Sequence, residues 1–263
     1  MLKIALIQFE PLLGNIAANI ITVRELIGRL SGAQLVVLPE LASTGYHFNN
    51  PEHAISLAED PGNSEYVAML TDLASKNNQF IVSGFNEKSK SGIYNSSLLI
   101  GPEGLMGIYR KMHLFMHEKE YFLPGDGELA VYDTGHCRLG MQICFDYLFP
   151  EPWRILSQKG AELIVHPSNL LTQNANKVLP GLALINHVYI ATTNRIGIER
   201  DLEFNGGSMI LDPKGEILVK ASASAEELIE YEIDISLAHN KMITSMNHVF
   251  EDRRPEQYKQ DIC

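Results

Sequence analysis

The sequence predicts an α/β protein in which strands and helices alternate along one continuous chain. Short apolar runs without alternation, such as residues 35–38, are typical of strands buried on both faces. Segments with apolar residues at helical spacing, such as residues 16–30, lie between these runs. No linker rich in Pro, Gly and Ser separates them, so residues 1–263 are expected to form a single domain.

The elements of the first half follow from local patterns. Residues 2–8 form an apolar run that predicts a first buried strand. Asn15 is a good helix N-cap, and Gly32 is a good stop for the helix between them. The further elements expected here are a strand at 35–38, a helical region ending near 77, a strand at 79–84, a hairpin of 93–100 with 105–110, and two strands within 128–143.

The second half repeats the alternation and ends in a polar tail. Its expected elements are a helix at 150–159, a strand at 163–165, a helix at 176–187, a strand at 188–193, a hairpin of 209–211 with 216–220, and a strand at 228–235. Because each hairpin adds an antiparallel partner, mixed sheets are expected. The tail from about Met246 is too polar for a core, and we expect it to pack on a neighbouring copy.

Composition excludes several classes of function. The chain has 32 acidic and 21 basic residues and a net charge of −11, which argues against binding nucleic acid. No apolar stretch approaches the ~18 residues of a membrane-spanning helix. The apolar run at the start is too short for a signal peptide. Three cysteines form no disulfide framework, so a cytoplasmic, reduced protein is expected.

Three reactive side chains follow strand-like segments. Cys144 lies on a turn between a strand and a helix, Glu40 closes the strand at 35–38, and Lys111 closes the strand at 105–110. Alone, each has a plain structural explanation: a buried thiol, a solvated carboxylate and a surface lysine. Together they make a plausible nucleophile, general base and oxyanion-binding cation.

Other chemistries fit the sequence less well. His113, His117 and His166 are rivals for a Cys/His pair, and His166 has the best position, at a strand end. No two cysteines have the spacing of a zinc site, and no phosphate-binding glycine motif occurs, so no metal and no cofactor are expected. These exclusions leave nucleophilic catalysis without a cofactor.

The reactive residues belong to a set of distinctive segments. In chain order, these are IALIQ (4–8), LVVLPELASTGY (35–46), YNS (94–96), YRKMHLF (109–115), FLPG (122–125), GMQICFD (140–146), FPE (149–151) and NRIG (194–197). Together and in this order, they resemble the nitrilase (carbon–nitrogen hydrolase) superfamily. The resemblance implies an αββα four-layer sandwich with two mixed sheets. It also implies a homodimer or higher homo-oligomer, with the C-terminal tail near the interface.

The resemblance assigns roles to individual residues. Glu40 would be the general base, Lys111 the oxyanion-stabilising cation and Cys144 the nucleophile. A second glutamate would orient the substrate, and position favours Glu118 over Glu120.

The resemblance also implies a set of substrate contacts. The backbone N–H of Phe145 would complete the oxyanion hole. Ser168 and Asn169 would line the acyl side of the pocket, and Tyr46 is assigned to the substrate site with them.

The implied activity is hydrolysis of a small C–N bond through a Cys thioester, releasing ammonia and a carboxylic acid. Small aliphatic amides are the favoured substrates, with nitriles as a further class, and no partner other than the small molecule and a second copy is expected. An ω-amidase or an N-carbamoyl hydrolase is the alternative; Arg195 or Lys177 could then bind a substrate carboxylate. A non-catalytic binding or scaffold protein of the same fold is the alternative of another class.

Overall fold

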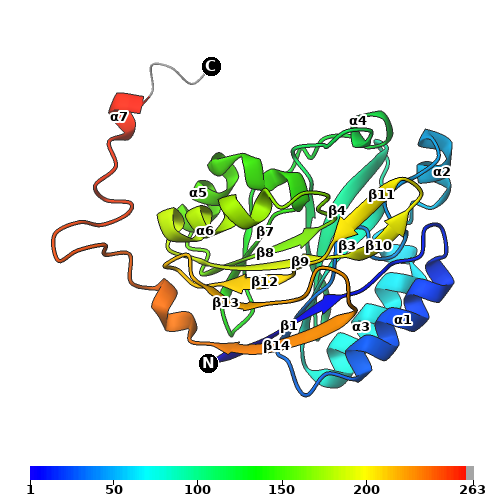
Figure 1. Cartoon of the computed structure of the whole chain (residues 1–263), viewed down its shortest axis with the longest axis horizontal. Coiled ribbons are helices and arrows are strands. Elements are labelled where there is room, and N and C mark those ends of the chain that lie inside the picture. Colours follow the sequence, from blue (N-terminus) through cyan, green and yellow to red (C-terminus); the bar gives the residue numbers. More distant parts are fainter. Residues whose placement is uncertain (259–263) are drawn as a thin grey trace.

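Two six-stranded sheets lie face to face, and helices cover both outer faces (Figure 1). The computed structural model describes residues 1–258. The first sheet has the order β14-β1-β2-β3-β4-β5 and contains β1 (Leu2–Gln8), β2 (Leu35–Val37), β3 (Phe80–Lys88), β4 (Ile93–Gly101), β5 (Gly104–Arg110) and β14 (Glu227–Ile233). The second has the order β13-β12-β9-β8-β7-β6 and contains β6 (Val131–Asp133), β7 (Arg138–Met141), β8 (Leu163–Ser168), β9 (Tyr189–Asn194), β12 (Met209–Leu211) and β13 (Ile217–Lys220).

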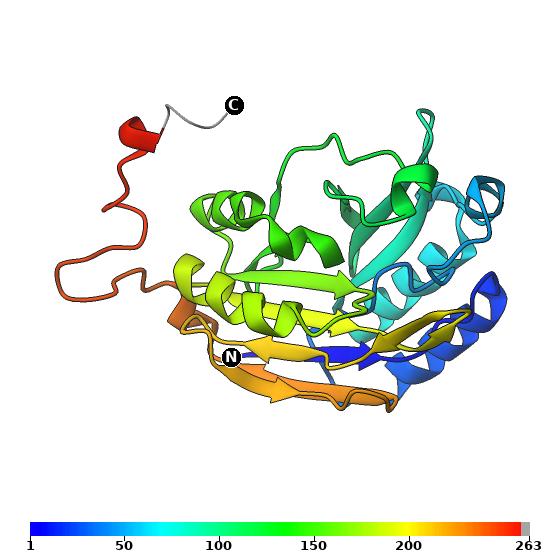
Figure 2. The ribbon, with the colours of Figure 1, turned by 45° about the horizontal axis from the view of Figure 1, so that its top comes forward.

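Both sheets are mixed, as the sequence predicts. In the first sheet, β1, β2 and β3 are parallel, while β14, β4 and β5 pair antiparallel with their neighbours. In the second, β7, β8 and β9 are parallel, and the hairpin of β12 and β13 extends them in the antiparallel sense. The predicted αββα four-layer sandwich is therefore confirmed, and the turned view in Figure 2 shows the layers.

The outer helices begin and end where local chemistry favours it. The side chain of Asn15 caps α1 (Ile16–Gly28), and the side chain of Ser64 caps α3 (Glu65–Asn77). Asn78 ends α3 in the left-handed conformation with φ of 50°. These two helices cover the first sheet, whereas α5 (Pro150–Gln158) and α6 (Ala175–Asn186) cover the second.

Successive residues of the buried strands serve two different cores. In β2, Val36 packs with α1 and α3, whereas Leu35 and Val37 face the layer between the sheets. Met141 of β7 meets Ser97 of β4 across that layer, with Sδ 3.5 Å from Oγ. The absence of apolar–polar alternation in these strands follows from burial on both faces.

Shorter elements complete the chain. They are α2 (Pro51–Ser56), the 3-10 turns η1 (Pro61–Asn63), η2 (Cys144–Leu148) and η3 (Ile235–Ala238), the helices α4 (Glu118–Tyr121) and α7 (Pro255–Tyr258), and a hairpin of β10 (Ile196–Glu199) with β11 (Leu202–Asn205). The expected elements did not include this hairpin, because each strand has only four residues, too few for its alternation of apolar and polar residues to give a clear signal. Beyond η3 the chain leaves the body as an extended tail (Figures 1 and 2). Within residues 1–258, no helix combines the length and the apolarity needed to cross a bilayer.

Candidate active site

Cys144 lies on a tight turn between β7 and α5. Its backbone has φ of +40°, a left-handed conformation that is strained for a residue with a Cβ atom. Two hydrogen bonds stabilise the turn: Trp153 Nε1 donates to the Asp146 carbonyl (3.0 Å), and Asp146 N donates to the Ile143 carbonyl (3.0 Å). The thiol is thereby held in one position, with only 5% of the residue exposed.

Glu40 is positioned by an unusually close backbone contact. The chain after β2 lies directly on Gly84 of β3, where Gly84 N donates to the Pro39 carbonyl (3.0 Å) and Ala42 N donates to the Gly84 carbonyl (3.2 Å). A Cβ atom at residue 84 would lie 2.2 Å from the backbone nitrogen of Leu41. Glycine at this position therefore allows the Glu40 carboxylate to be buried at the strand end.

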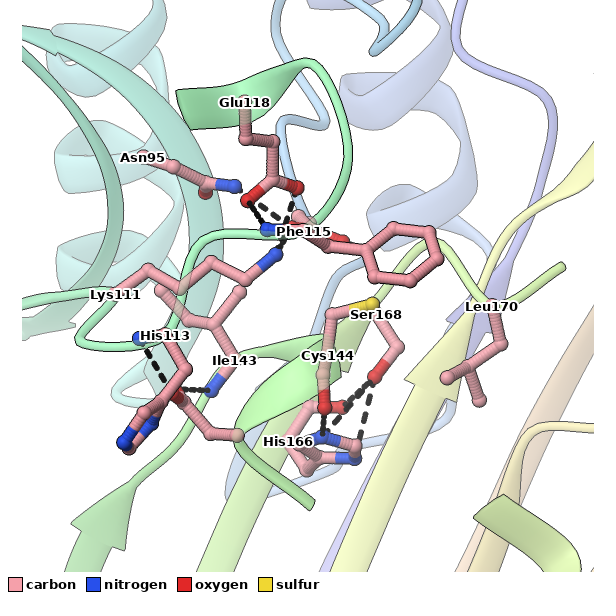
Figure 3. Close-up of polar contacts among 12 residues, drawn as sticks. Asn95, Lys111, His113, Phe115, Glu118, Ile143, Cys144, His166, Ser168 and Leu170 are labelled. Atoms are coloured by element: carbon pink, nitrogen blue, oxygen red, sulfur yellow. Dashed lines mark hydrogen bonds and ion pairs between the residues drawn. The ribbon is translucent and has the colours of Figure 1, made fainter. Parts of the chain in front are cut away.

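Lys111 connects two buried carboxylates. Its Nζ lies 2.6 Å from Glu40 Oε1 and 2.7 Å from Glu118 Oε1, and all three side chains are nearly inaccessible. Asn95 fixes both ends of this arrangement, since its Nδ2 donates to Glu40 Oε1 (2.7 Å) and its carbonyl accepts from Lys111 N (2.8 Å). Figure 3 shows Lys111 reaching Glu118 beside Cys144.

Burial and neighbouring charges shift the pKa values of the groups in this cluster, in part in opposite directions. Burial lowers the pKa of Lys111, but the charges of Glu118 and Glu40 outweigh it and raise the pKa above its ordinary value. Burial raises the pKa of Glu118 to about 7, although Lys111 lowers it. Burial and the charge of Glu40 raise the pKa of the Cys144 thiol. The charge of Lys111 lowers this pKa, but by less. The resting thiol is therefore neutral at pH 7 and needs a base.

Glu40 and Glu118 differ in whether a carboxylate oxygen lacks a hydrogen-bond donor. Both oxygens of Glu118 are engaged, Oε1 by Lys111 and Oε2 by the backbone N–H of Phe115 (3.1 Å). Glu40 Oε1 binds Lys111 and Asn95, while Glu40 Oε2 is buried without a hydrogen-bond partner among the described residues. Glu40 is therefore the carboxylate with a lone pair available for the thiol proton.

Asp146 joins the lysine segment to the cysteine turn. Its Oδ2 accepts from Tyr109 Oη (2.7 Å) and from Ile143 N (3.0 Å). Its Oδ1 accepts from both the backbone N–H (3.1 Å) and Nδ1 (2.8 Å) of His113. Tyr109 and His113 flank Lys111 by two residues on either side, so this buried carboxylate ties the position of Lys111 to that of Cys144.

A cavity of about 140 Å³ opens at Cys144. Its walls are mainly aromatic and aliphatic, with Phe115, Phe145 and Leu170 among them and no Lys, Arg, Asp or Glu among the described lining residues. The Asn169 side chain also lines it; its Oδ1 and Nδ2 are buried and have no hydrogen-bond partner within residues 1–258. The cavity thus has mainly apolar walls, to which Asn169, Asn174, Thr172 and Tyr147 add polar but uncharged groups.

Tyr46 borders a second, smaller cavity, which it shares with Glu118. The hairpin of β10 and β11, which was not among the expected elements, fixes the backbone at Tyr46 and His47. Its residue Glu199 accepts hydrogen bonds from the backbone N–H groups of Tyr46 (2.9 Å) and His47 (2.7 Å). Burial and the neighbouring Glu118 and Glu40 charges raise the pKa of Tyr46, so its phenol stays neutral.

The rival residues lie elsewhere. The imidazole of His113 binds Asp146, while His117 is exposed and pairs with Glu120 (2.9 Å), which the structure places at the surface. His166 approaches Cys144, but its Nε2 lies 2.8 Å from the Cys144 carbonyl oxygen.

The remaining side chains considered from the sequence are engaged or distant. Ser168 Oγ donates to the His166 carbonyl (3.1 Å), and its contact with substrate stays a prediction. Arg195 is buried in an ion pair with Glu199 and stacks on Phe204, while Lys177 is exposed on α6. Neither cation lines the cavity at Cys144.

Known proteins are similar to most or nearly all of this chain. A nitrilase from Pyrococcus abyssi is 44% identical over 260 residues, covering 98% of this chain and 99% of that protein. An omega-amidase from Bos taurus is 33% identical over 245 residues, covering 87% of this chain and 86% of that protein.

A solved structure has the same fold as this chain. A carbon–nitrogen hydrolase from Helicobacter pylori superposes with a TM-score of 0.84 at 28% identity, covering 90% of this chain and 91% of that one. The sequence model of the carbon-nitrogen hydrolase family matches residues 3–240. The chain therefore belongs to the carbon–nitrogen hydrolase family, as the resemblance of its segments predicted.

Proposed function

We propose that this protein hydrolyses small neutral aliphatic amides through a thioester on Cys144. The observation that carries the proposal is a set of three neighbouring groups. They are a thiol on a strained turn, a glutamate oxygen without a partner and a buried ammonium. One of them, the thiol, lines a small cavity without charged side chains among its described lining residues, and the charges of Glu40 and Lys111 both act on it. Each of the three groups supplies one requirement of acyl transfer: a nucleophile, a base and an oxyanion partner.

In the first half-reaction, Glu40 Oε2 takes the thiol proton as Cys144 Sγ attacks the amide carbon. The negative oxygen that forms is stabilised by Lys111 Nζ and by the backbone N–H of Phe145. Glu40 then gives the proton to the leaving nitrogen, the C–N bond breaks and ammonia departs. The product is a thioester between Cys144 and the acyl group.

In the second half-reaction, water takes the place of ammonia. Glu40 accepts a proton from the water, whose oxygen attacks the thioester carbon, and the proton returns to the Cys144 sulfur as the acid leaves. Glu118 keeps Lys111 in place, because it holds the ammonium from the side opposite Glu40 and is itself bound by Phe115 N.

The cavity determines the size and charge of the acyl group. A cavity of about 140 Å³ is small, which favours a short acyl chain such as that of propionamide or butyramide. The carboxamide of Asn169 carries both a donor and an acceptor without partners, which complements the N–H₂ and C=O of a primary amide. A substrate carboxylate or ammonium would be buried without a counter-ion there, at a cost of several kcal/mol.

The substrate preference leads to a direct prediction. Propionamide and butyramide are expected to be hydrolysed, with kcat/KM at least about tenfold above that for succinamate and for N-carbamoylputrescine, because the described wall carries no charge to pair with either. Ammonia release measures all four, with propionitrile as a fifth compound. Cys144→Ala is the control and should release none.

The alternatives are distinct outcomes of the same assay. A preference for succinamate would replace the proposal by an ω-amidase, and a preference for the carbamoyl compound by a carbamoyl hydrolase. Silence on all five compounds, with Cys144 unreactive toward thiol reagents, would favour a non-catalytic member of the family.

We also propose that the protein forms a homodimer in which the tail contributes to the interface. The tail carries apolar side chains that lie in solvent in the single chain, with Met246 85% and Ile243 56% exposed. Leu184 and Ile185 on α6 are also about half exposed. A second copy of the chain that packs on these two segments would remove their apolar side chains from water.

Disruption of these contacts is expected to dissociate the dimer. The full-length Ile243→Asp/Met246→Asp variant should sediment as a monomer at concentrations at which the wild type is a dimer, because two charges would be buried without partners. Ile21→Asp on α1, with an equally exposed side chain (58%), is the matched control and should stay dimeric. A dimer unchanged in the tail variant would remove the tail from the interface.

Two further parts of the proposal rest on the sequence. The whole chain is proposed as a single carbon–nitrogen hydrolase domain, and a cytoplasmic location is proposed from its few cysteines.

A further inference from the structure

His166 is a buried group that the proposed mechanism does not use. It belongs to β8, is fully inaccessible, and lies beneath the turn that carries Cys144 (Figure 3). Its Nε2 is 2.8 Å from the Cys144 carbonyl oxygen, and its Nδ1 is 3.2 Å from both Thr192 Oγ1 and Ser168 Oγ. A carbonyl oxygen can only accept, so Nε2 carries the hydrogen, and Nδ1 accepts from the Thr192 hydroxyl.

The protonation of the ring agrees with these contacts. Burial lowers the pKa of His166 to about 4, so the imidazole is neutral at pH 7. A neutral ring has one donor and one acceptor, and both are used here. The ring edge packs against Trp153, with ring centroids 5.5 Å apart, which limits its rotation.

The hydrogen bond to the Cys144 carbonyl has a consequence on the other side of the peptide. The peptide unit between Cys144 and Phe145 is planar and trans, so its C=O and N–H point in opposite directions. With the carbonyl directed toward His166, the Phe145 N–H is directed away from it. Within residues 1–258, no acceptor for this N–H is found, as is usual for the first turn of a helix.

We propose that His166 is the positioning residue of the oxyanion hole. By holding the Cys144 carbonyl, it fixes the peptide plane of a strained residue so that the Phe145 N–H faces the oxygen of the reacting acyl group. This inference rests on the proposed function, because the oxyanion arises in the acyl transfer proposed above. His166 contacts no reacting atom; it acts through the backbone.

The test compares two replacements of His166. His166→Phe keeps a planar ring but removes the donor, whereas His166→Gln keeps an amide N–H near the position of Nε2. In His166→Phe, kcat for propionamide is expected to fall by roughly 10²-fold, comparable to the loss of one oxyanion donor. KM should change little, and His166→Gln should recover most of the rate.

A thiol reaction without an oxyanion separates positioning from general damage. Methyl methanethiosulfonate transfers its methylthio group to the Cys144 sulfur, releasing methanesulfinate, and no carbonyl takes part. Its rate with His166→Phe should stay within about threefold of wild type, and the melting temperature reports folding. Equal losses of thiol labelling and turnover would mean that His166 supports only the turn, and an unchanged kcat would overturn the proposal directly.

Propionaldehyde extends the test to a case in which no amide is hydrolysed. The Cys144 sulfur adds to the aldehyde carbon, and the thiol proton passes by way of Glu40 to the new oxygen, giving a hemithioacetal. The protection of Cys144 from labelling measures the affinity of the protein for propionaldehyde. In His166→Phe this affinity should fall by roughly the same factor as kcat. Inactivity of wild type toward every amide would refute the proposed function, while an unchanged aldehyde affinity in His166→Phe would refute the role of His166.

Thr192→Val removes one hydrogen-bond partner of His166 Nδ1 and should lower kcat and the aldehyde affinity by a smaller factor than His166→Phe. It replaces His166→Phe in the test if that variant fails to fold.

Discussion

Glu40→Gln is expected to lower the turnover of propionamide by about 10³-fold or more. Glutamine can still accept from Asn95 and Lys111 through its carbonyl oxygen, so the hydrogen bonds of Glu40 Oε1 are kept. What disappears is the oxygen without a partner, Oε2, and with it the base for a thiol whose pKa burial has raised. General base catalysis contributes roughly 10²–10⁴-fold, and here the same group serves both half-reactions.

Glu118→Gln is the matched control, because it removes the other carboxylate of the same ammonium. Both oxygens of Glu118 already have partners, so a smaller loss of kcat is expected, accompanied by a change in KM if Glu118 also orients the substrate. The measurement is steady-state ammonia release between pH 6 and 9 for both variants and the wild type. A greater loss of kcat in Glu118→Gln than in Glu40→Gln would transfer the role of base to Glu118.

The sequence predicted the long elements because these leave local signals, and it singled out the residues of the candidate site because each follows a strand-like run. The strand that ends before Glu40 is an unbroken apolar run, and the helix after Asn15 has both a cap and a period. The meeting of Glu40, Lys111 and Cys144 could be anticipated because each follows a strand, and strand ends gather at the edges of sheets. Residue chemistry alone left the role of each residue open, and the resemblance of whole segments then assigned the roles, which stay predictions.

The supporting contacts could not be predicted because they depend on residues distant in sequence. The strands β10 and β11 have only four residues each, too few for a clear periodic signal, yet Glu199 of β10 accepts a hydrogen bond from Tyr46 N, 153 residues away in sequence. The choice between Glu118 and Glu120 needed the fold, since only one of the two faces Lys111. His166 looked like a partner for the thiol, and only the three-dimensional contact shows that it binds the backbone.

Lys111→Met is expected both to reduce turnover by 10²–10³-fold or more and to destabilise the protein. The first effect is the loss of a cation at the oxyanion. The second arises because Glu40 and Glu118 would remain buried and close together with no ammonium between them. Removing one partner of a buried ion pair typically costs about 3–5 kcal/mol in the free energy of unfolding.

The destabilisation should depend on pH in a defined direction. Without Lys111, the folded-state pKa of Glu118, which is about 7 even with the lysine present, rises further above its ordinary value of 4.5. A carboxyl with a raised folded-state pKa binds its proton more tightly in the folded protein. The stability it contributes is present below pH 4.5 and is lost as the pH rises through the folded-state pKa. The deficit of Lys111→Met relative to the wild type should therefore grow between pH 5 and pH 8.

Urea unfolding at pH 5, 6, 7 and 8 measures this deficit, and the double variant Lys111→Met/Glu118→Gln separates the two roles of the lysine. Replacing Glu118 by a neutral amide removes the repulsion, so most of the lost stability should return at pH 8. Turnover should not return, because the oxyanion still lacks its cation. A double variant that recovers both would show that Lys111 serves only to neutralise the carboxylates. A deficit that grows as the pH falls would mean that the buried cluster does not hold the charges assigned to it.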